Sequence, residues 1–525
     1  MVDTAPPSLE AAASSEAALS PRHSSPQLLG VLRALAIFAV CAGAAGGFYG
    51  LDHGSLTDDT YTFLDWGRDL RHGFLPLLEK RTFHPLPVAL STVFSAFGQA
   101  TPTFVVVLNL TLFALMGVAA FRITRALKFG FVAAFFSFVF VMLNPSLAVD
   151  ASVAYVNVPF AACVVWALAY ELEGRREFVW PLLFIGGLLR PEGWAFSVGY
   201  GLYRWWQKGH PFAPARWWRT AALALGPMII WLGSEWVMFG SPATSFNDTR
   251  APNVQSTGTD TATGLASTLH IAMTTAPLVA AGVGVLVVLF LGPKRSGRVA
   301  VAATVIAAFT LIVLASSKFN VPGRHFSVLF TFLGILAGIG VTGPARLLAV
   351  RWKERSSGAV RPPGAGWTST LTQRTIAITL AAIAGGALVF GLAFNSTRIR
   401  LLVNFRRIHT AELEGASLDR TMRAALPMID TAGAQRHVVV MLGAIYPAQL
   451  DWDLGVPFNV VIQQTEPFER LLVEPSKPVW EALAKRGLTQ LPLTPPPPHW
   501  RLIVNEAWKV WGPPGTGKVR LGSDY

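Results

Sequence analysis

The sequence predicts an all-α polytopic membrane protein that carries a small α/β domain at its C-terminal end. Of its 525 residues, 52% are hydrophobic and only 14% are charged, whereas soluble domains carry roughly 25% charged residues. The hydrophobic residues gather in runs of about twenty, the length that crosses a bilayer core of about 30 Å. Residues 395–525, by contrast, have ordinary polarity and no such run. This pattern excludes a soluble enzyme, a secreted disulfide-rich protein and a disordered chain.

Residues 1–27 are rich in Ala, Ser and Pro and predict a disordered cytosolic tail. In the transmembrane domain, residues 28–394, about nine apolar segments are each long enough to span a bilayer. They are residues 28–50, 102–121, 131–148, 153–171, 221–239, 268–291, 299–316, 325–343 and 375–394. A further apolar segment, 178–206, is broken by Arg190-Pro191-Glu192-Gly193, so we expect a hairpin that enters from the cytosol. Two full spans there would leave the downstream topology unchanged, whereas one would invert it.

The basic residues predict the orientation. The net charge is +13, and Lys and Arg cluster at 122–128, 204–219, 294–298 and 346–361, all in loops on the side of the N-terminus. Because cytoplasmic loops keep Lys and Arg, we expect a cytosolic N-terminus and no nucleic-acid partner. Heavy use of Ala, Gly and Arg is typical of a high-GC bacterium, in which the membrane is the cytoplasmic one.

Three long segments then face outward: residues 51–86, 240–267 and 395–525. Within the last, the short apolar runs 438–442, 459–462 and 502–504 predict buried strands, and residues 418–426 and 479–486 predict helices. We therefore expect a small extracytoplasmic α/β domain.

Two adjacent carboxylates, Asp58 and Asp59, open the first outward segment. Such a pair just outside a membrane suits a general base for an acceptor hydroxyl, or binding of a divalent cation as a cofactor. The alternative is helix capping, with Thr57 or Asp58 at the N-terminus of a helix over 61–71.

Arg190 and Glu192 are charged residues in an apolar segment, where each costs about 2.5–3.5 kcal/mol or more. They are expected to pair with each other, or Arg190 holds a lipid-borne phosphate in bidentate fashion. Pro191 and Gly193 release backbone groups that must line protein or water. The alternative is an ordinary interfacial turn.

For each of the other candidate site residues, the sequence leaves two interpretations open. His84 either donates to a substrate oxygen or is structural. Lys318, Arg324 and His325 form either a phosphate site on the outer face or a contact with lipid headgroups. Glu235 is either a buried functional acid or an interfacial residue.

Two further patterns are excluded as sites. Residues 512–518 satisfy the phosphate-loop string, but Val519 follows where Ser or Thr would hold Mg²⁺, so we predict no nucleotide there. The two cysteines, Cys41 and Cys163, lie in separate apolar runs and predict no disulfide or thiolate metal site.

Several of these motifs stand in an order known from one family. Asp58-Asp59, followed by Tyr61 and by Gly67-Arg68-Asp69-Leu70, resembles the opening of membrane glycosyltransferases of the GT-C fold. Residues 189–193 are similar to the L-(T/A)-R-P-E-G signature of a bacterial subset that includes arabinofuranosyltransferase-like proteins. Residues 239–245 resemble the loop that follows it, and residues 323–326 a late G-R-Y motif. The resemblance covers roughly residues 28–343.

The resemblance implies transfer of a hexosyl or pentosyl group from a polyprenyl-phosphate donor to a cell-envelope glycan, lipid or protein acceptor, with inversion. It implies that Asp58 is the base, that Asp59 supports it or binds metal, and that Arg190 and Arg324 bind phosphate. The chain departs from the family pattern in residues 74–85, in the absence of the Gly-x-Glu near Asn157, and in a Ser at 241 where the family has Asp.

Two other classes stay open. A lipid or polymer transporter or flippase would need ionisable residues along several spans. A catalytically silent relative would act as a membrane scaffold, with the outer domain as its binding element.

Overall fold

The computed structural model describes three parts of the chain: a helical bundle, short connecting turns and five C-terminal strands. The described residues are 26–52, 56–73, 83–207, 214–242, 244, 273, 275–316, 323–357, 438–441, 461–463, 480–483, 501–505 and 509–512. The span predicted at 375–394 and the tail at 1–25 lie outside these residues.

The apolar runs predicted as spans are mostly helical in the residues that the structure describes. These are α1 (Pro26–Asp52), α4 (Thr101–Ala126), α7 (Asn157–Leu172), α10 (Pro214–Phe239), α13 (Thr275–Leu291), α14 (Lys294–Ser316) and α15 (Ser327–Ser357). Within the described residues, four helices are long and apolar enough to cross a membrane, or five with one bent pair, and α7, α13 and the start of α15 are shorter apolar helices. The protein is therefore a helical membrane protein, and the number of full spans stays a prediction.

The run predicted as one span at 131–148 is two helices. α5 (Gly130–Met142) and α6 (Pro145–Ser152) meet at 56°. Pro145 has no backbone N–H to continue the ladder of α5, and the side chain of Asn144 accepts a hydrogen bond from Leu147 N at 3.1 Å, which caps a new helix. The bend follows from this Asn-Pro pair.

Residues 178–206 form the expected broken hairpin. α8 (Val179–Leu189) and α9 (Gly193–Gln207) run antiparallel. Two hydrogen bonds join them: Ser197 Oγ donates to Leu183 O at 3.2 Å, and, nearer the turn, Trp194 Nε1 donates to Gly187 O at 3.0 Å. A Cβ at Gly193 would lie 2.7 Å from the backbone of Gly186, so this close turn requires glycine. The side of the membrane from which the hairpin enters stays a prediction.

The first outward segment folds as two helices that cross closely. α2 (Asp58–Arg71) begins at Thr57, whose side chain accepts a hydrogen bond from Thr60 N at 3.3 Å, so the capping expected of Thr57 is confirmed. α3 (Pro85–Phe94) runs through the 3₁₀ turn η3 (Ser95–Ala100) into α4. A Cβ at Gly67 would lie 2.4 Å from the backbone of Ser91, which shows how tightly α2 lies on α3.

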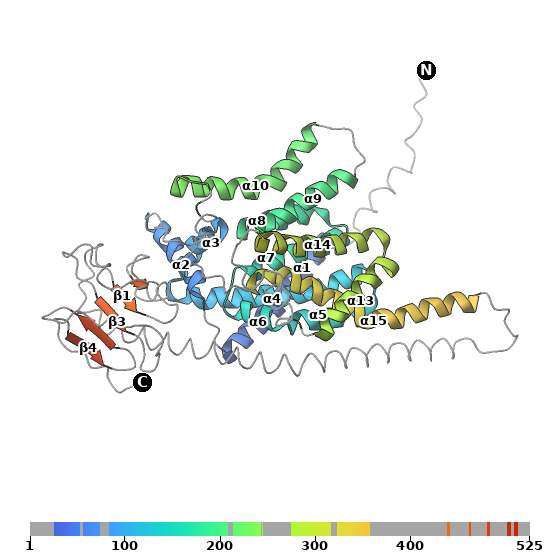
Figure 1. Ribbon diagram of the computed structural model, residues 1–525, viewed down its shortest axis with the longest axis horizontal. Coiled ribbons are helices and arrows are strands. Elements are labelled where there is room, and N and C mark those ends of the chain that lie inside the picture. The colour runs from blue at the N-terminus through green and yellow to red at the C-terminus, as the bar shows by residue number, and fades with distance from the viewer. Residues whose placement is uncertain are drawn as a thin grey trace, which may run out of the picture.

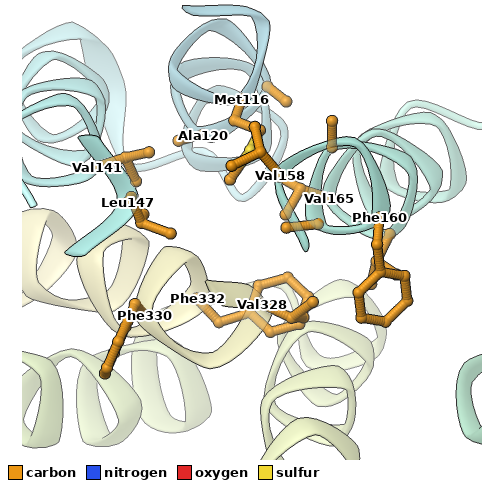
Figure 2. Close-up of a cluster of buried hydrophobic side chains, with 14 of the residues drawn as sticks. Met116, Ala120, Val141, Leu147, Val158, Phe160, Val165, Val328, Phe330 and Phe332 are labelled. Atoms are coloured by element: carbon orange, nitrogen blue, oxygen red, sulfur yellow. The ribbon is translucent and has the colours of Figure 1, made fainter. Parts of the chain in front are cut away.

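The core lies where α4, α5, α6, α7 and α15 meet (Figure 1). Figure 2 shows Met116 of α4, Val158 of α7 and Phe330 of α15 among the side chains that fill this space, and all three are buried. Large apolar side chains also point outward, including Val237 at 87% exposed and Phe290 at 80% exposed. Such a surface is expected of helices that face lipid rather than water.

The C-terminal strands pair in one sheet of order β2-β1-β3-β5-β4. They are β1 (Val438–Met441), β2 (Val461–Gln463), β3 (Trp480–Leu483), β4 (Arg501–Asn505) and β5 (Lys509–Gly512). β1 runs parallel to β2 and β3, and β5 runs antiparallel to β3 and β4.

Three of these strands, β1, β2 and β4, overlap the predicted ones. The helix predicted at 479–486 is wrong, because β3 is the central strand of the sheet and pairs on both edges, and such pairing overrides local helix propensity. The helix predicted at 418–426 lies outside the described residues, so an α/β domain stays a prediction.

Candidate functional site

Arg190 lies at the tip of the hairpin and pairs with Glu192. Its Nε donates to Glu192 Oε2 at 3.0 Å and its Nη2 donates to Glu192 Oε1 at 2.8 Å. Both residues are 7% exposed. Two parallel bonds fix the plane of the guanidinium as well as its position. The expected pairing of the two charges is therefore confirmed.

Two other helical segments hold the same guanidinium. Asn157, the first residue of α7, accepts a hydrogen bond from Arg190 Nη1. His325 lies in the 3₁₀ turn η5 (Gly323–Phe326), and its Nδ1 is 2.7 Å from both Arg190 Nη2 and Glu192 Oε1. These contacts leave one N–H of Arg190 Nη1 without a partner among the described residues. The hairpin tip, α7 and η5 thus meet at one charged group.

His84 ties the first outward segment to the hairpin. Its Nδ1 is 2.8 Å from Leu189 O, the carbonyl next to Arg190. Burial, with the positive charge of Arg190 second, lowers the pKa of His84 to about 4, so the ring is neutral at pH 7. A carbonyl only accepts, so Nδ1 carries the single N–H of the neutral ring. That proton is used by Leu189, which favours the structural alternative for His84.

Aromatic rings enclose His84 on two sides. The ring centroid of Phe63, on α2, is 5.1 Å away, and that of Trp231, on α10, is 5.0 Å away. Trp231 Nε1 donates to Glu235 Oε1 at 2.8 Å, and Glu235 is fully buried. The predicted candidate Glu235 therefore lies inside the protein, behind this aromatic cluster, rather than at an interface.

The carboxylates of the first outward segment lie at the start of α2. Thr60 Oγ1 donates to Ala154 O at 3.1 Å, which anchors this end of α2 beside the α6–α7 turn. The charge of Asp59 acts on His84, so the carboxylate lies near the hairpin tip. For Asp58 the structure describes the backbone and not the side chain.

The structure says little of two residues that were predicted to bind phosphate, Arg324 and Lys318. Arg324 lies in η5 next to His325, with only its backbone described. Lys318 lies outside the described residues. The expected cluster of Lys318, Arg324 and His325 stays a prediction for this reason.

Asn157, which contacts Arg190, was not predicted as a site residue from the sequence, and neither was the buried carboxylate of Asp150. Asp150 is 6% exposed on α6 and accepts a hydrogen bond from Ser327 Oγ at 2.9 Å, at the start of α15. The sequence placed it between two straight spans. The Asn144-Pro145 pair was the signal that could have found it, because it predicts a helix break that turns α6 inward.

Among the residues that the structure describes, no group of three or more His, Cys, Asp and Glu side chains could hold a metal ion. Since the side chain of Asp58 is not among them, binding of a divalent cation at Asp58 and Asp59 stays a prediction.

Comparison with known proteins gives a structural likeness only. No protein-family model matches the sequence, and neither does any curated protein. The apo crystal structure of ArnT from Cupriavidus metallidurans is similar at a TM-score of 0.52 and 14% identity, over 92% of this chain and 97% of that chain. The same protein bound to undecaprenyl phosphate is similar at 0.50 and 16% identity, with the same coverage. This likeness agrees with the order of motifs along the chain: the protein has the fold of the GT-C membrane glycosyltransferases.

Proposed function

We propose that the protein is a membrane glycosyltransferase that moves a sugar from a polyprenyl-phosphate donor to an acceptor on the outer face, with inversion. The observation that carries the proposal is a cluster of four side chains at the hairpin tip, those of Arg190, Glu192, Asn157 and His325. The cluster lies near the N-terminal end of α2, which carries Asp58 and Asp59. The structurally similar ArnT binds undecaprenyl phosphate, which supports a donor of this chemical class.

Arg190 is the proposed phosphate ligand. Glu192 and Asn157 hold its guanidinium rigid, and one N–H of Nη1 has no partner among the described residues. A preorganised donor in a buried site stabilises charge that develops on a leaving group without having to reorganise. Glu192 neutralises much of the charge of Arg190, so Arg324 and Lys318 are proposed to share the phosphate.

Asp58 is the proposed base, with Asp59 in support. In the proposed step an acceptor hydroxyl oxygen attacks the anomeric carbon from the face opposite the phosphate. Its proton passes to the Asp58 carboxylate, and the bond from the anomeric carbon to the phosphate oxygen breaks, with the electron pair leaving on the phosphate. A single displacement of this kind inverts the anomeric centre, and no covalent intermediate with the protein is formed.

The finer topology belongs to the same proposal. It comprises about nine spans, a cytosolic N-terminus in the cytoplasmic membrane, and an extracytoplasmic α/β domain after residue 394. The charge asymmetry of the loops supports this orientation, and it places α2 and the hairpin tip on the outer side, where an envelope acceptor is found.

The test is transfer of radiolabel from polyprenyl-phosphate sugars to acceptors in cell membranes. Native protein is compared with Asp58→Asn and with Glu177→Gln, a matched control at an exposed carboxylate on η4 (Arg176–Phe178). We expect transfer by the native protein and the control and a loss of about 100-fold or more in Asp58→Asn, the usual contribution of a general base. Full transfer by Asp58→Asn would contradict the assignment of the base.

A further inference from the structure

The base of the hairpin, at the end away from Arg190, holds a second polar cluster that the proposed transfer does not use. Glu171 of α7 is 8% exposed and accepts hydrogen bonds from Tyr200 Oη at 2.9 Å and Tyr203 Oη at 3.3 Å. Arg176 Nε donates to the same carboxylate at 3.3 Å. Three donors therefore satisfy Glu171, and its charge is paired.

The next turn of α9 carries donors that lack acceptors. Arg295 Nη2 of α14 donates to Gln207 Oε1 at 2.6 Å. Gln207 Nε2 and Arg204 Nη1, however, are shielded from solvent and have no hydrogen-bond partner among the described residues. These residues are three positions apart on α9, so both lie on one side of the helix. Buried donors without acceptors are destabilising, most of all charged ones, unless a ligand supplies the acceptor.

The charges around these donors call for an anion. Lys294 and Arg295 form the exposed first turn of α14, and Arg298 follows one turn later. A helix N-terminus carries partial positive charge, so cations there are unfavourable unless an anion lies nearby. The neighbouring carboxylates are already committed, Glu171 as described above and Glu173 to Arg122.

An apolar cavity of about 130 Å³ adjoins the cluster. α7, α8, α9 and α14 supply most of its lining, with Glu171 and Tyr203 at its polar part and Phe196, Val299 and Ile306 among its apolar residues. Apolar cavities of about this size can accept hydrocarbon groups. An unpartnered arginine donor and an unpartnered amide donor, close to a hydrocarbon-sized space, match a ligand with an anionic head and an alkyl chain.

We propose that the base of the hairpin binds one anionic phospholipid. Its phosphate binds the exposed Arg295. Arg204 and Gln207 turn their shielded donors toward it on binding, and part of one acyl chain enters the cavity between α9 and α14. This site is separate from the proposed donor site, because α9 runs between Arg190 and Arg204 at about 1.5 Å per residue, or roughly 20 Å. In Figure 1 the adjoining ends of α9 and α14 lie on the side of the bundle away from α2. The lipid braces α9 against α14 and so supports the hairpin that presents Arg190.

The test is native mass spectrometry of the delipidated full-length protein, titrated with phosphatidylglycerol or with phosphatidylcholine of the same chains. We expect one phosphatidylglycerol to bind, about tenfold more tightly than phosphatidylcholine. Arg295→Gln is expected to bind phosphatidylglycerol about tenfold more weakly than the native protein, as expected for the loss of one charge-assisted hydrogen bond. Arg295 is exposed, so its replacement leaves folding intact. Arg122→Gln, which removes a cation paired with Glu173, is the matched control and keeps native affinity.

A second variant tests the cavity. Ala303→Leu narrows the space beside α14, and we expect weaker binding of long-chain phosphatidylglycerol with unchanged binding of a short-chain form. Equal retention of the two headgroups, or unchanged binding in Arg295→Gln, would overturn the proposal. Displacement of phosphatidylglycerol by polyprenyl phosphate in Arg190→Ala would overturn it as well, since the site at the base of the hairpin would then bind the polyprenyl-phosphate donor.

Discussion

At the scale of single residues, the site depends on contacts between positions far apart in the sequence. Arg190 touches Asn157 and His325 through side chains that no local pattern connects. The sequence predicted that Arg190 and Glu192 are charged residues needing a partner, because isolated charges in apolar segments are costly. It did not predict Asn157, an uncharged residue whose role depends entirely on where α7 begins.

Asn157→Ala tests the support of the guanidinium. Removing the amide leaves Arg190 Nη1 without its acceptor, and a hydrogen bond to a charged group contributes about 1.5–3 kcal/mol. We expect sugar transfer to fall by about tenfold or more, mainly through a higher KM for the donor. The matched control is Asn109→Ala on α4, because Asn109 is buried and its Oδ1 has no partner among the described residues. Equal losses in both variants would show that Asn157 acts only by packing.

The buried, neutral His84 is expected to make the free energy of unfolding depend on pH. Its pKa is about 4 in the folded protein and 6.5 in its unperturbed state. Below pH 6.5 the imidazole of His84 is protonated in the unfolded chain but stays neutral in the folded protein. The contribution of His84 to the free energy of unfolding is therefore fully present above pH 6.5 and is lost as the pH falls. The loss is about 1.4 kcal/mol per pH unit down to pH 4. Thermal unfolding in detergent at pH 7.5 and 5.5 measures it.

His84→Asn is the comparison, because an amide can still donate to Leu189 O and does not titrate in this range. We expect the variant to lose less stability than the native protein between the two pH values. An identical pH dependence in both would contradict the buried neutral imidazole.

At the scale of elements, the sequence predicted helices well and their breaks unevenly. Long apolar runs identify α1, α4 and α10 because length and hydropathy are local properties. The break at Arg190-Pro191 was visible as charge and proline within an apolar run. Strand β3 was not predictable, because its pairing partners lie at residues 438–441 and 509–511.

Gly193→Ala tests the closure of the hairpin. The added Cβ would lie 2.7 Å from the backbone of Gly186, and backbone cannot move aside as a flexible side chain can. We expect a loss of about 1–3 kcal/mol in unfolding free energy, together with loss of transfer. Gly201→Ala on the same helix is the control, since its nearest contact, 3.4 Å from Ala224 Cβ, is ordinary. The two variants are compared by thermal unfolding in detergent, and similar melting temperatures would argue against close packing at the tip.

At the scale of the whole molecule, the fold agrees with the structurally similar ArnT over 92% of the chain at 14% identity. A likeness at such low identity concerns the fold alone. Apolar runs and helix breaks can be seen in the sequence itself, so the fold was predictable, whereas no local pattern identifies the acceptor. The orientation rests on loop charge alone, so it needs a direct test.

Single cysteines provide that test in a variant whose Cys41 and Cys163 are replaced by Ala. Positive loops are expected inside, so Glu177→Cys is expected to resist a membrane-impermeant maleimide in intact cells, while Ser241→Cys is expected to react. Permeabilised cells provide the control, in which both react. The reverse pattern would invert the topology and place the hairpin tip on the cytosolic side.

In the proposed function, a rigid arginine at the hairpin tip binds the phosphate of a lipid-linked sugar during transfer. The most direct measurement compares native protein and Arg190→Ala in proteoliposomes supplied with a panel of radiolabelled polyprenyl-phosphate sugars and envelope acceptors. We expect label transfer from at least one donor by the native protein and a loss of about 100-fold or more in the variant. Transfer from no donor by folded native protein, or equal transfer by both proteins, would contradict this proposal.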